Sequence, residues 1–133
     1  MEKFFHVDVY TPTGKYLSTD AEFLSVKSTL SVLGIMPNHA PLITTLEICK
    51  LSIRNKNTEN RYAISGGVMH IKKDHNVVLM LDAIESVEEI DLSRALDAKR
   101  RAEERLEKND EVDVTRAKAA LARALNRISI KKE

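Results

Sequence analysis

The sequence predicts an all-β N-terminal sandwich followed by an α-helical hairpin. All four glycines, all three prolines and all six aromatic residues of this 133-residue chain lie before residue 91. Glycine and proline are typical of the turns between short strands. The segment after residue 90 instead holds two polar runs rich in alanine and arginine, with helical spacing. We therefore expect a β-sandwich domain over 1–84 and a two-helix domain over 85–133.

Short alternating segments separated by turns fill the first domain. Residues 5–10 place Phe5, Val7 and Val9 on one side, which is the period-two pattern of a half-buried strand. A proline and a glycine make a turn at 11–14. Further strands are expected at 21–28, 48–54, 62–65, 68–72 and 77–82, with turns at 55–60 and 73–76 and a shaped loop at 33–42. Many short strands with no helix between them favour a sandwich or a barrel.

Two helices joined by a short polar link are expected in the second domain. Asp91 and Asp113 are suited to cap their N-termini, because a carboxylate accepts a hydrogen bond from an unpaired amide of the first turn. The first helix should run to about Lys108. The facing sides carry Ala95, Ala98, Ala102, Ala117, Ala120 and Ala124. Alanine allows close approach but buries little apolar surface, at roughly 25 cal/mol per Å², so the hairpin should be able to leave its docked position.

Arginines follow the same spacing, seven and then four residues, on both helices. They are Arg94, Arg101 and Arg105, and Arg116, Arg123 and Arg127. At about 100° per residue each trio lies within a band of roughly 40°. One interpretation is a solvated basic face on each helix. The other is that folding brings the two stripes together, so that a polyanion between them offsets the repulsion of the guanidinium groups and holds the hairpin shut.

The composition argues against several classes of protein. The net charge is +1, whereas a dedicated nucleic-acid binder is usually strongly basic. No apolar run approaches the roughly 20 residues that span a bilayer, and the N-terminus lacks the pattern of a secretion signal. A single cysteine excludes an intrachain disulfide framework. We expect a soluble intracellular protein whose membrane association is made through a partner.

Residue types that carry catalysis or metal binding do not cluster in the sequence. The four histidines are dispersed, so satisfied or solvent-facing histidines are favoured over a metal site. Cys49 is interpreted as a small buried residue rather than a nucleophile. Ser65-Gly66-Gly67 has no partner base in a recognisable motif, and a bend or bulge is preferred over an oxyanion loop. An enzyme is therefore the weakest of the functional classes.

Three motifs, in their order and spacing, resemble those of the epsilon subunit family of F-type ATP synthase. They are Gly34-Ile35-Met36-Pro37-Asn38-His39-Ala40-Pro41-Leu42, Ser65-Gly66-Gly67 and Ile90-Asp91-Leu92-Ser93-Arg94-Ala95. The resemblance implies a sandwich of about ten strands that binds the gamma subunit and rests on the membrane c-ring. It implies a non-catalytic rotor subunit of the central stalk, which helps couple proton flow to ATP synthesis at the cytoplasmic face of a bacterial membrane. The helices are expected to extend toward the alpha and beta subunits and to inhibit ATP hydrolysis.

The last motif also implies a regulatory nucleotide site, since Ile/Leu-Asp-x-x-Arg-Ala marks ATP binding in some family members. The resemblance places this site on Glu85, Ile90, Asp91, Arg94, Ala95, Arg123 and Arg127. Arginines can meet the phosphates, and groups near Glu85 and Asp91 can meet the adenine or ribose. Because the chain has no Gly-x-x-x-x-Gly-Lys-Ser/Thr loop, ATP is expected to be a ligand that holds the helices down, neither a substrate nor a required cofactor.

The proline loop and the segment before it are expected to contact the gamma subunit or the c-ring. The implied contact residues are Val32, Pro37, Asn38 and His39. Many family members read Ser-Gly-Glu-Leu-Gly before the loop, whereas this chain has Val32 at the acidic position. Valine there allows a more apolar contact.

A second functional class stays open beside the rotor subunit. It is a stand-alone nucleotide-sensing adaptor module with the same sandwich and hairpin. Tight co-purification with the gamma subunit is expected for a rotor subunit and is not required of an adaptor.

Overall fold

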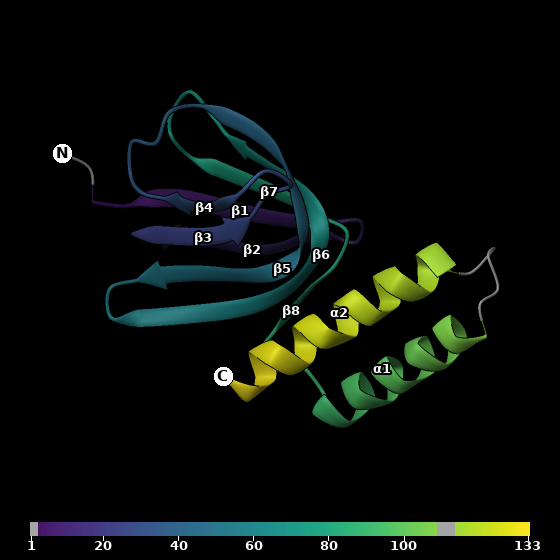
Figure 1. Ribbon diagram of the computed structural model, residues 1–133. Coiled ribbons are helices and arrows are strands. Elements are labelled where there is room, and N and C mark those ends of the chain that lie inside the picture. Colours follow the sequence, from purple (N-terminus) through teal and green to yellow (C-terminus); the bar gives the residue numbers. More distant parts are fainter. Residues whose placement is uncertain (1–2, 109–113) are drawn as a thin grey trace.

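A computed structural model describes residues 3–108 and 114–133 of the chain (Figure 1). A β-sandwich is followed by an antiparallel pair of helices, which confirms the predicted fold class. The elements are β1 (Phe5–Thr11), β2 (Gly14–Ala21), β3 (Phe23–Lys27), β4 (Val32–Ile35), β5 (Leu42–Asn55), β6 (Thr58–Ile71), β7 (Val77–Leu81), β8 (Ile84–Ser86), α1 (Leu92–Glu107) and α2 (Val114–Lys132).

The eight strands form one hydrogen-bonded sheet that folds over into two layers. Neighbouring strands follow the order β2-β1-β7-β6-β5-β3-β4, and β8 also pairs with β6. Only the β1–β7 pair is parallel among these described strands. The 14-residue strands β5 and β6 curve through both layers (Figure 1). The structure describes eight strands where the family resemblance implies about ten, because β5 and β6 each run as one continuous 14-residue strand.

A double glycine makes the bend in β6. Gly66 and Gly67 have φ angles of 95° and 146°, a region that residues with a side chain rarely adopt. At this point the partner of β6 changes from β7 to β8, and the amide of Asp82 donates to the carbonyl of Gly66 at 3.0 Å. A Cβ atom on Gly67 would lie 2.2 Å from the carbonyl oxygen of Met80. The bend predicted for Ser65-Gly66-Gly67 is therefore confirmed.

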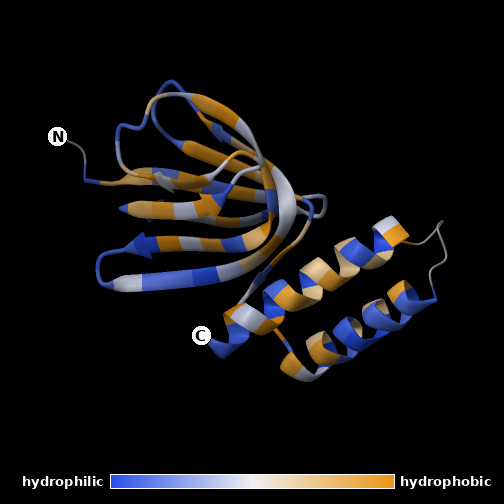
Figure 2. Cartoon of the chain, viewed as in Figure 1, coloured by the Kyte–Doolittle hydropathy of each residue, from blue (hydrophilic) through white to orange (hydrophobic). Residues whose placement is uncertain are grey.

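Alternate residues of the strands fill one core between the layers. Phe5, Val7 and Val9 are buried on β1, as their alternation predicts, and Leu24 and Val26 are buried on β3. Apolar residues are frequent on the strands, whereas apolar and hydrophilic positions alternate along the helices (Figure 2). The main core thus consists of residues of the sandwich alone, and the helices pack on its outer surface.

Several strand assignments differ from the sequence prediction. Strand β8 was not expected, and the strand expected at 48–54 begins six residues earlier, at Leu42. The loop expected at 33–42 begins as strand β4, which pairs with β3 and buries Ile35 completely. The strands expected at 62–65 and 68–72 are one bent strand, β6. No strand was expected at β2, because both faces of this edge strand are largely exposed and the alternation of apolar residues is weak.

An alanine seam joins α1 and α2 side by side. The carboxylate of Asp91 accepts a hydrogen bond from the Arg94 amide at 3.2 Å, and α1 ends at Glu107 with Lys108 as its C-cap. Both ends agree with the prediction, whereas Asp113, expected to cap the second helix, lies outside the described residues. The buried alanines of the predicted seam are Ala95, Ala102, Ala117 and Ala124. Neither described helix combines the length and the apolar character that crossing a lipid bilayer requires.

The hairpin rests on the sandwich through a small apolar cluster. Ile130 of α2 packs with Ala63 of β6 and with Ile90, which lies between β8 and α1. By contrast, Leu96 and Leu125 on the helices are 43% and 45% exposed. Since so few apolar side chains join the two parts, apolar burial holds the hairpin only weakly, as the sequence predicts.

We expect Gly67→Ala to destabilise the sandwich strongly, because the new Cβ atom meets a backbone carbonyl that cannot move without breaking the β6–β7 ladder. The loss in the free energy of unfolding should be about 3 kcal/mol or more, measured by urea denaturation. Gly14→Ala is the matched control: its φ is 124° but its Cβ atom meets nothing within 4 Å, so only the conformational cost of about 1–2 kcal/mol remains. Equal losses in the two variants contradict the steric explanation.

Candidate functional site

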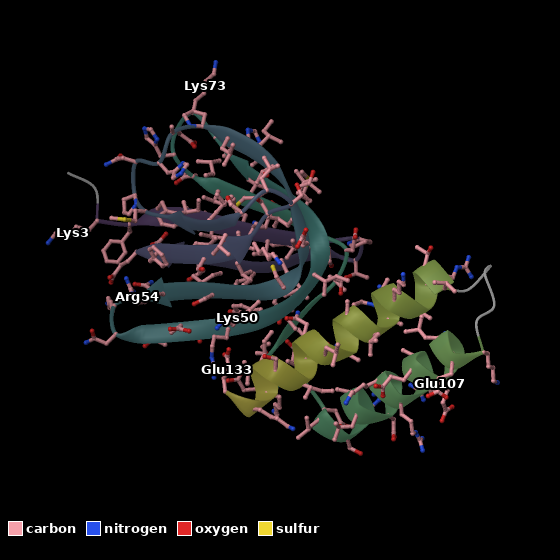
Figure 3. All side chains as sticks on the ribbon, in the orientation of Figure 1. Lys3, Lys50, Arg54, Lys73, Glu107 and Glu133 are labelled. Carbon is pink, nitrogen blue, oxygen red and sulfur yellow. The ribbon has the colours of Figure 1, made fainter. Side chains whose placement is uncertain are left out.

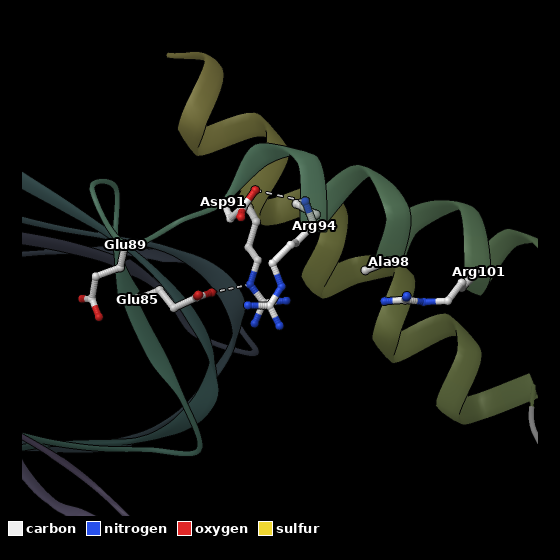
Figure 4. Close-up of a pocket in the computed structure, with 8 residues that line it drawn as sticks. Glu85, Glu89, Asp91, Arg94, Ala98 and Arg101 are labelled. Atoms are coloured by element: carbon white, nitrogen blue, oxygen red, sulfur yellow. Dashed lines mark hydrogen bonds and ion pairs between the residues drawn. The ribbon is translucent and has the colours of Figure 1, made fainter.

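A pocket of about 290 Å³ opens where β8, the start of α1 and α2 meet (Figure 4). Its lining residues are Glu85, Glu89, Asp91, Arg94, Ala95, Ala98, Arg101 and Arg127. The residues from α1 share one face of the helix, because they recur every three or four positions. β8 contributes Glu85, and α2 contributes Arg127. The pocket thus exists only while the hairpin is folded beside the sandwich.

The charges of the pocket are unevenly arranged. The Nε of Arg127 donates to the carboxylate of Glu85, and both side chains are about one-third exposed. Figure 4 shows Glu85 pointing toward the arginines, Arg101 further along α1, and Glu89 turned away. Guanidinium groups therefore border the pocket from two helices, and carboxylates border the end nearest the sandwich. Such a site suits a ligand with an anionic part and a polar uncharged part.

Five of the seven residues expected at the nucleotide site line this one pocket. They are Glu85, Asp91, Arg94, Ala95 and Arg127. Arg123 lies beside them, in a smaller crevice that it shares with Glu85 and Arg127. Ile90 is 3% exposed and packs in the apolar cluster beneath the hairpin, so its side chain anchors the start of α1. The binding of ATP itself stays a prediction.

Three lining residues were not among the expected site residues. Two of them stand out in the sequence by their helical spacing, Arg101 in the arginine stripe and Ala98 in the alanine seam, but the family resemblance did not assign them to this site. Glu89 lies in a turn, where no periodic spacing in the sequence indicates which way its side chain points. The two arginine stripes meet only in part, because Arg105 and Arg116 are exposed and line neither the pocket nor the crevice.

Polar contacts fasten α2 to the sandwich beside the pocket. The side-chain amide of Asn126 donates to the carbonyl of Cys49, and the Lys131 ammonium donates to the carbonyl of Val87, each at 2.8 Å. The carboxylate of Glu133 accepts hydrogen bonds from Lys50 at 2.9 Å and from Arg61 at 2.5 Å. Figure 3 shows Lys50 and Glu133 next to each other at the end of α2. The ion pairs of Glu133 are solvent-accessible and individually weak, whereas the contacts of Asn126 and Lys131 are partly buried.

The residues expected to contact other subunits lie at the surface of the sandwich. Val32 is 71% exposed, and Asn38 has a positive φ of 67° that shapes the loop after Pro37. The Nδ1 of His39 lies 2.7 Å from the carbonyl of Ala40. Other apolar side chains in or next to this segment are also strongly exposed: Leu30, Met36 and Ile43. An apolar contact is consistent with this surface, and the contact itself stays a prediction.

The remaining cysteine and histidine side chains considered for catalysis or metal binding have structural roles or surroundings. Cys49 is buried, and burial raises the pKa of its thiol, which opposes formation of the nucleophilic thiolate. Within residues 3–108 and 114–133, no group of three or more His, Cys, Asp or Glu side chains is arranged to hold a metal ion. The Nδ1 of His75 lies 3.0 Å from the carbonyl of His39 and ties two turns together.

Two domain families of known proteins together match nearly the whole chain. The beta-sandwich domain of the ATP synthase delta/epsilon chain matches residues 4–86, and the long alpha-helix domain of the same chain matches residues 88–132. The ATP synthase epsilon chain of Bacillus licheniformis is 39% identical over 131 residues, which cover 98% of this chain and 99% of that one. The epsilon chain of Pelotomaculum thermopropionicum is 42% identical over 107 residues, or 80% and 79% of the two chains.

Two solved structures share the fold. One is a chain of the Euglena gracilis mitochondrial ATP synthase, OSCP/F1/c-ring, with a TM-score of 0.84, 18% identity, and coverage of 92% of this chain and 78% of that one. The other belongs to the Tetrahymena thermophila mitochondrial ATP synthase central stalk and c-ring, with a TM-score of 0.57, 21% identity, and coverage of 67% and 70%. At these identities the likeness concerns the fold alone.

We expect the docking of α2 to weaken in acid. Hydrogen bonds from Lys50 and then Arg61 lower the pKa of Glu133 below its ordinary value of 4.5. A lowered pKa means that this contact stabilises the docked helix above pH 4.5 and is lost as pH falls through the lowered value. The protection factors of the α2 amides, corrected for the intrinsic pH dependence of exchange, should therefore fall more than those of β1 between pH 6 and pH 3.

Glu133→Gln should remove this part of the pH dependence, whereas Glu107→Gln, at the exposed end of α1, should leave it in place. If the exchange of α2 in Glu133→Gln follows the same pH curve as in the unmodified chain, the contact does not fasten the helix.

Proposed function

The chain belongs to the ATP synthase delta/epsilon chain family, as a non-catalytic epsilon subunit, and from this premise we propose that it regulates ATP hydrolysis through a hairpin that ATP holds down. In this proposal the sandwich is the fixed part and the hairpin is the mobile part. Released from the sandwich, the helices extend toward the alpha and beta subunits and inhibit hydrolysis. ATP acts as a regulatory ligand and is not consumed.

The convergence of arginines from two helices on one pocket carries the proposal. Arg94 and Arg101 come from α1, and Arg127 comes from α2. Two unit positive charges 4 Å apart repel by about 4 kcal/mol at an effective dielectric constant of 20, so an anion between the helices favours the folded hairpin. A triphosphate supplies several negative oxygens that guanidinium groups can bind in pairs. The carboxylate of Glu85 lies where it can meet the ribose or the base.

The weak attachment of the hairpin supports the regulatory part of the proposal. A small apolar cluster around Ile130 and a few partly buried polar contacts join α2 to the sandwich. Because these contacts are modest, ligand binding changes the balance: a ligand at 100 times its Kd stabilises the state that binds it by about 2.7 kcal/mol. A hairpin held by a large apolar interface would not respond to such a change.

The sandwich supports the assembly part of the proposal. We place the subunit on the central stalk, bound to the gamma subunit and resting on the c-ring, with the complex at the cytoplasmic face of the bacterial membrane. The exposed apolar side chains of Leu30, Val32 and Ile43 suit an apolar partner surface, since such side chains gain free energy when they are covered. Through this attachment the subunit takes part in coupling proton flow to ATP synthesis.

We expect ATP to raise the melting temperature of the isolated chain and ADP to raise it less, because ADP has fewer anionic oxygens for the arginines. Calorimetric titration measures the affinities directly. The double variant Arg94→Ala with Arg127→Ala should abolish both responses. Arg105→Ala is the matched control, since Arg105 shares the stripe of Arg94 but is exposed outside the pocket. An unchanged nucleotide affinity in the double variant rules the proposed site out.

We also expect the chain to form a tight complex with the gamma subunit, assayed by co-purification and gel filtration. Val32→Glu should weaken binding to detergent-solubilised c-ring at least tenfold, because a charge would be buried without a partner. Asn57→Glu, in the β5–β6 turn, is the control. A chain that binds ATP but neither partner is the adaptor module considered as the alternative.

A further inference from the structure

A tyrosine of the sandwich holds the turn that leads into the pocket. The hydroxyl of Tyr16, on the edge strand β2, donates to the carboxylate of Glu89, 73 positions later in the chain. Glu89 belongs to the turn between β8 and α1 and lines the pocket. Its side chain turns away from the arginines, whereas that of Glu85 points toward them (Figure 4). The two carboxylates therefore have different partners.

The environment of Tyr16 keeps its hydroxyl a donor. Its ring packs edge-on against the buried ring of Tyr62, with centroids 6.3 Å apart and an interplanar angle of 84°. Burial, and then the hydrogen bond to Glu89, raises the pKa of Tyr16 to about 12. The same hydrogen bond, with a smaller contribution from the Ser86 amide, lowers the pKa of Glu89. At neutral pH a neutral hydroxyl thus donates to a charged carboxylate, which is among the stronger kinds of hydrogen bond.

Glu89 also closes the turn in which it lies. Its carboxylate accepts a hydrogen bond from the Ser86 amide at 3.0 Å, and its own amide donates to the Ser86 hydroxyl at 3.2 Å. The next residue, Ile90, is buried beneath the hairpin, and Asp91 then caps α1. The direction in which α1 leaves the sandwich is therefore set within this turn.

We propose that Tyr16 is a positioning residue for the pocket: by fixing Glu89 it fixes the turn 86–90, and through the turn it fixes the start of α1 against the sandwich. Tyr16 acts through Glu89, since it is not among the residues that line the pocket. Arg94 lies one helical turn after Asp91, so a shift of the turn moves the guanidinium group that borders the pocket. The link to ATP rests on the proposed function, and the link to the start of α1 does not.

Hydrogen exchange of the nucleotide-free chain tests the structural link. Tyr16→Phe keeps the ring and removes the hydroxyl, and it should accelerate exchange of the amides of residues 89–95 about 3- to 10-fold, the effect of one hydrogen bond. Exchange of β1 and β6 should not change. Tyr10→Phe is the matched control, because Tyr10 has the same 36% exposure as Tyr16 and lies on the neighbouring strand β1. No acceleration at residues 89–95 overturns the proposal.

Calorimetry with ATP tests the functional link. Tyr16→Phe should weaken ATP about 3- to 10-fold. Glu89→Ala should have at least as large an effect, because it also removes the contact with the Ser86 amide. Glu89→Gln, which keeps an acceptor, should have a smaller effect. Because the two groups act together, Tyr16→Phe combined with Glu89→Ala should lose no more affinity than Glu89→Ala alone. Additive losses overturn the proposal.

The exchange and calorimetry experiments distinguish the proposed nucleotide site from the proposed role of Tyr16. If the unmodified chain does not bind ATP, the proposed nucleotide site fails, and the exchange experiment still decides the role of Tyr16. If the chain binds ATP with equal affinity in Tyr16→Phe, the nucleotide site stands and the positioning role is refuted.

Discussion

Close packing of the two helices is the constraint on which the candidate site depends. Buried alanines such as Ala102 and Ala124 let α1 and α2 approach, and only at that separation do arginines from both helices border one pocket. Small side chains bring little apolar burial, so the seam that creates the pocket cannot also hold the hairpin firmly. The same residues therefore explain both the geometry of the candidate site and the weak attachment of the hairpin.

The sandwich supplies what the helices lack, a rigid edge at a fixed position. The bend at Gly66 and Gly67 lets β6 serve both layers, and β8 pairs with its first half, so Glu85 is presented from a strand rather than from a loop. One wall of the pocket is thus tied to the core, and the other two walls belong to the hairpin. Such a division allows a pocket to be dismantled without unfolding the protein.

Sequence reasoning was most successful where the signal is local. The cap at Asp91 and the burial of Phe5, Val7 and Val9 follow from hydrogen bonding and alternation within a few residues. Arg101 lines the pocket together with Arg94, as their shared helical stripe predicts. Strand β2 could not be predicted, because an exposed edge strand does not need alternating apolar residues. The role of Glu89 could not be predicted either, because its partner Tyr16 lies 73 positions away in the chain. Pairings of that kind are set by the tertiary fold.

Strand β5 has a mechanical consequence. It runs without interruption from Leu42 to Asn55, carrying the exposed Ile43 near one end and Cys49, whose carbonyl receives Asn126 of α2, near its middle. Six residues of extended chain separate these two positions by about 20 Å. A force applied at Ile43 therefore reaches the carbonyl that anchors Asn126 along one continuous strand, whereas the helix beyond that anchor is held by few contacts.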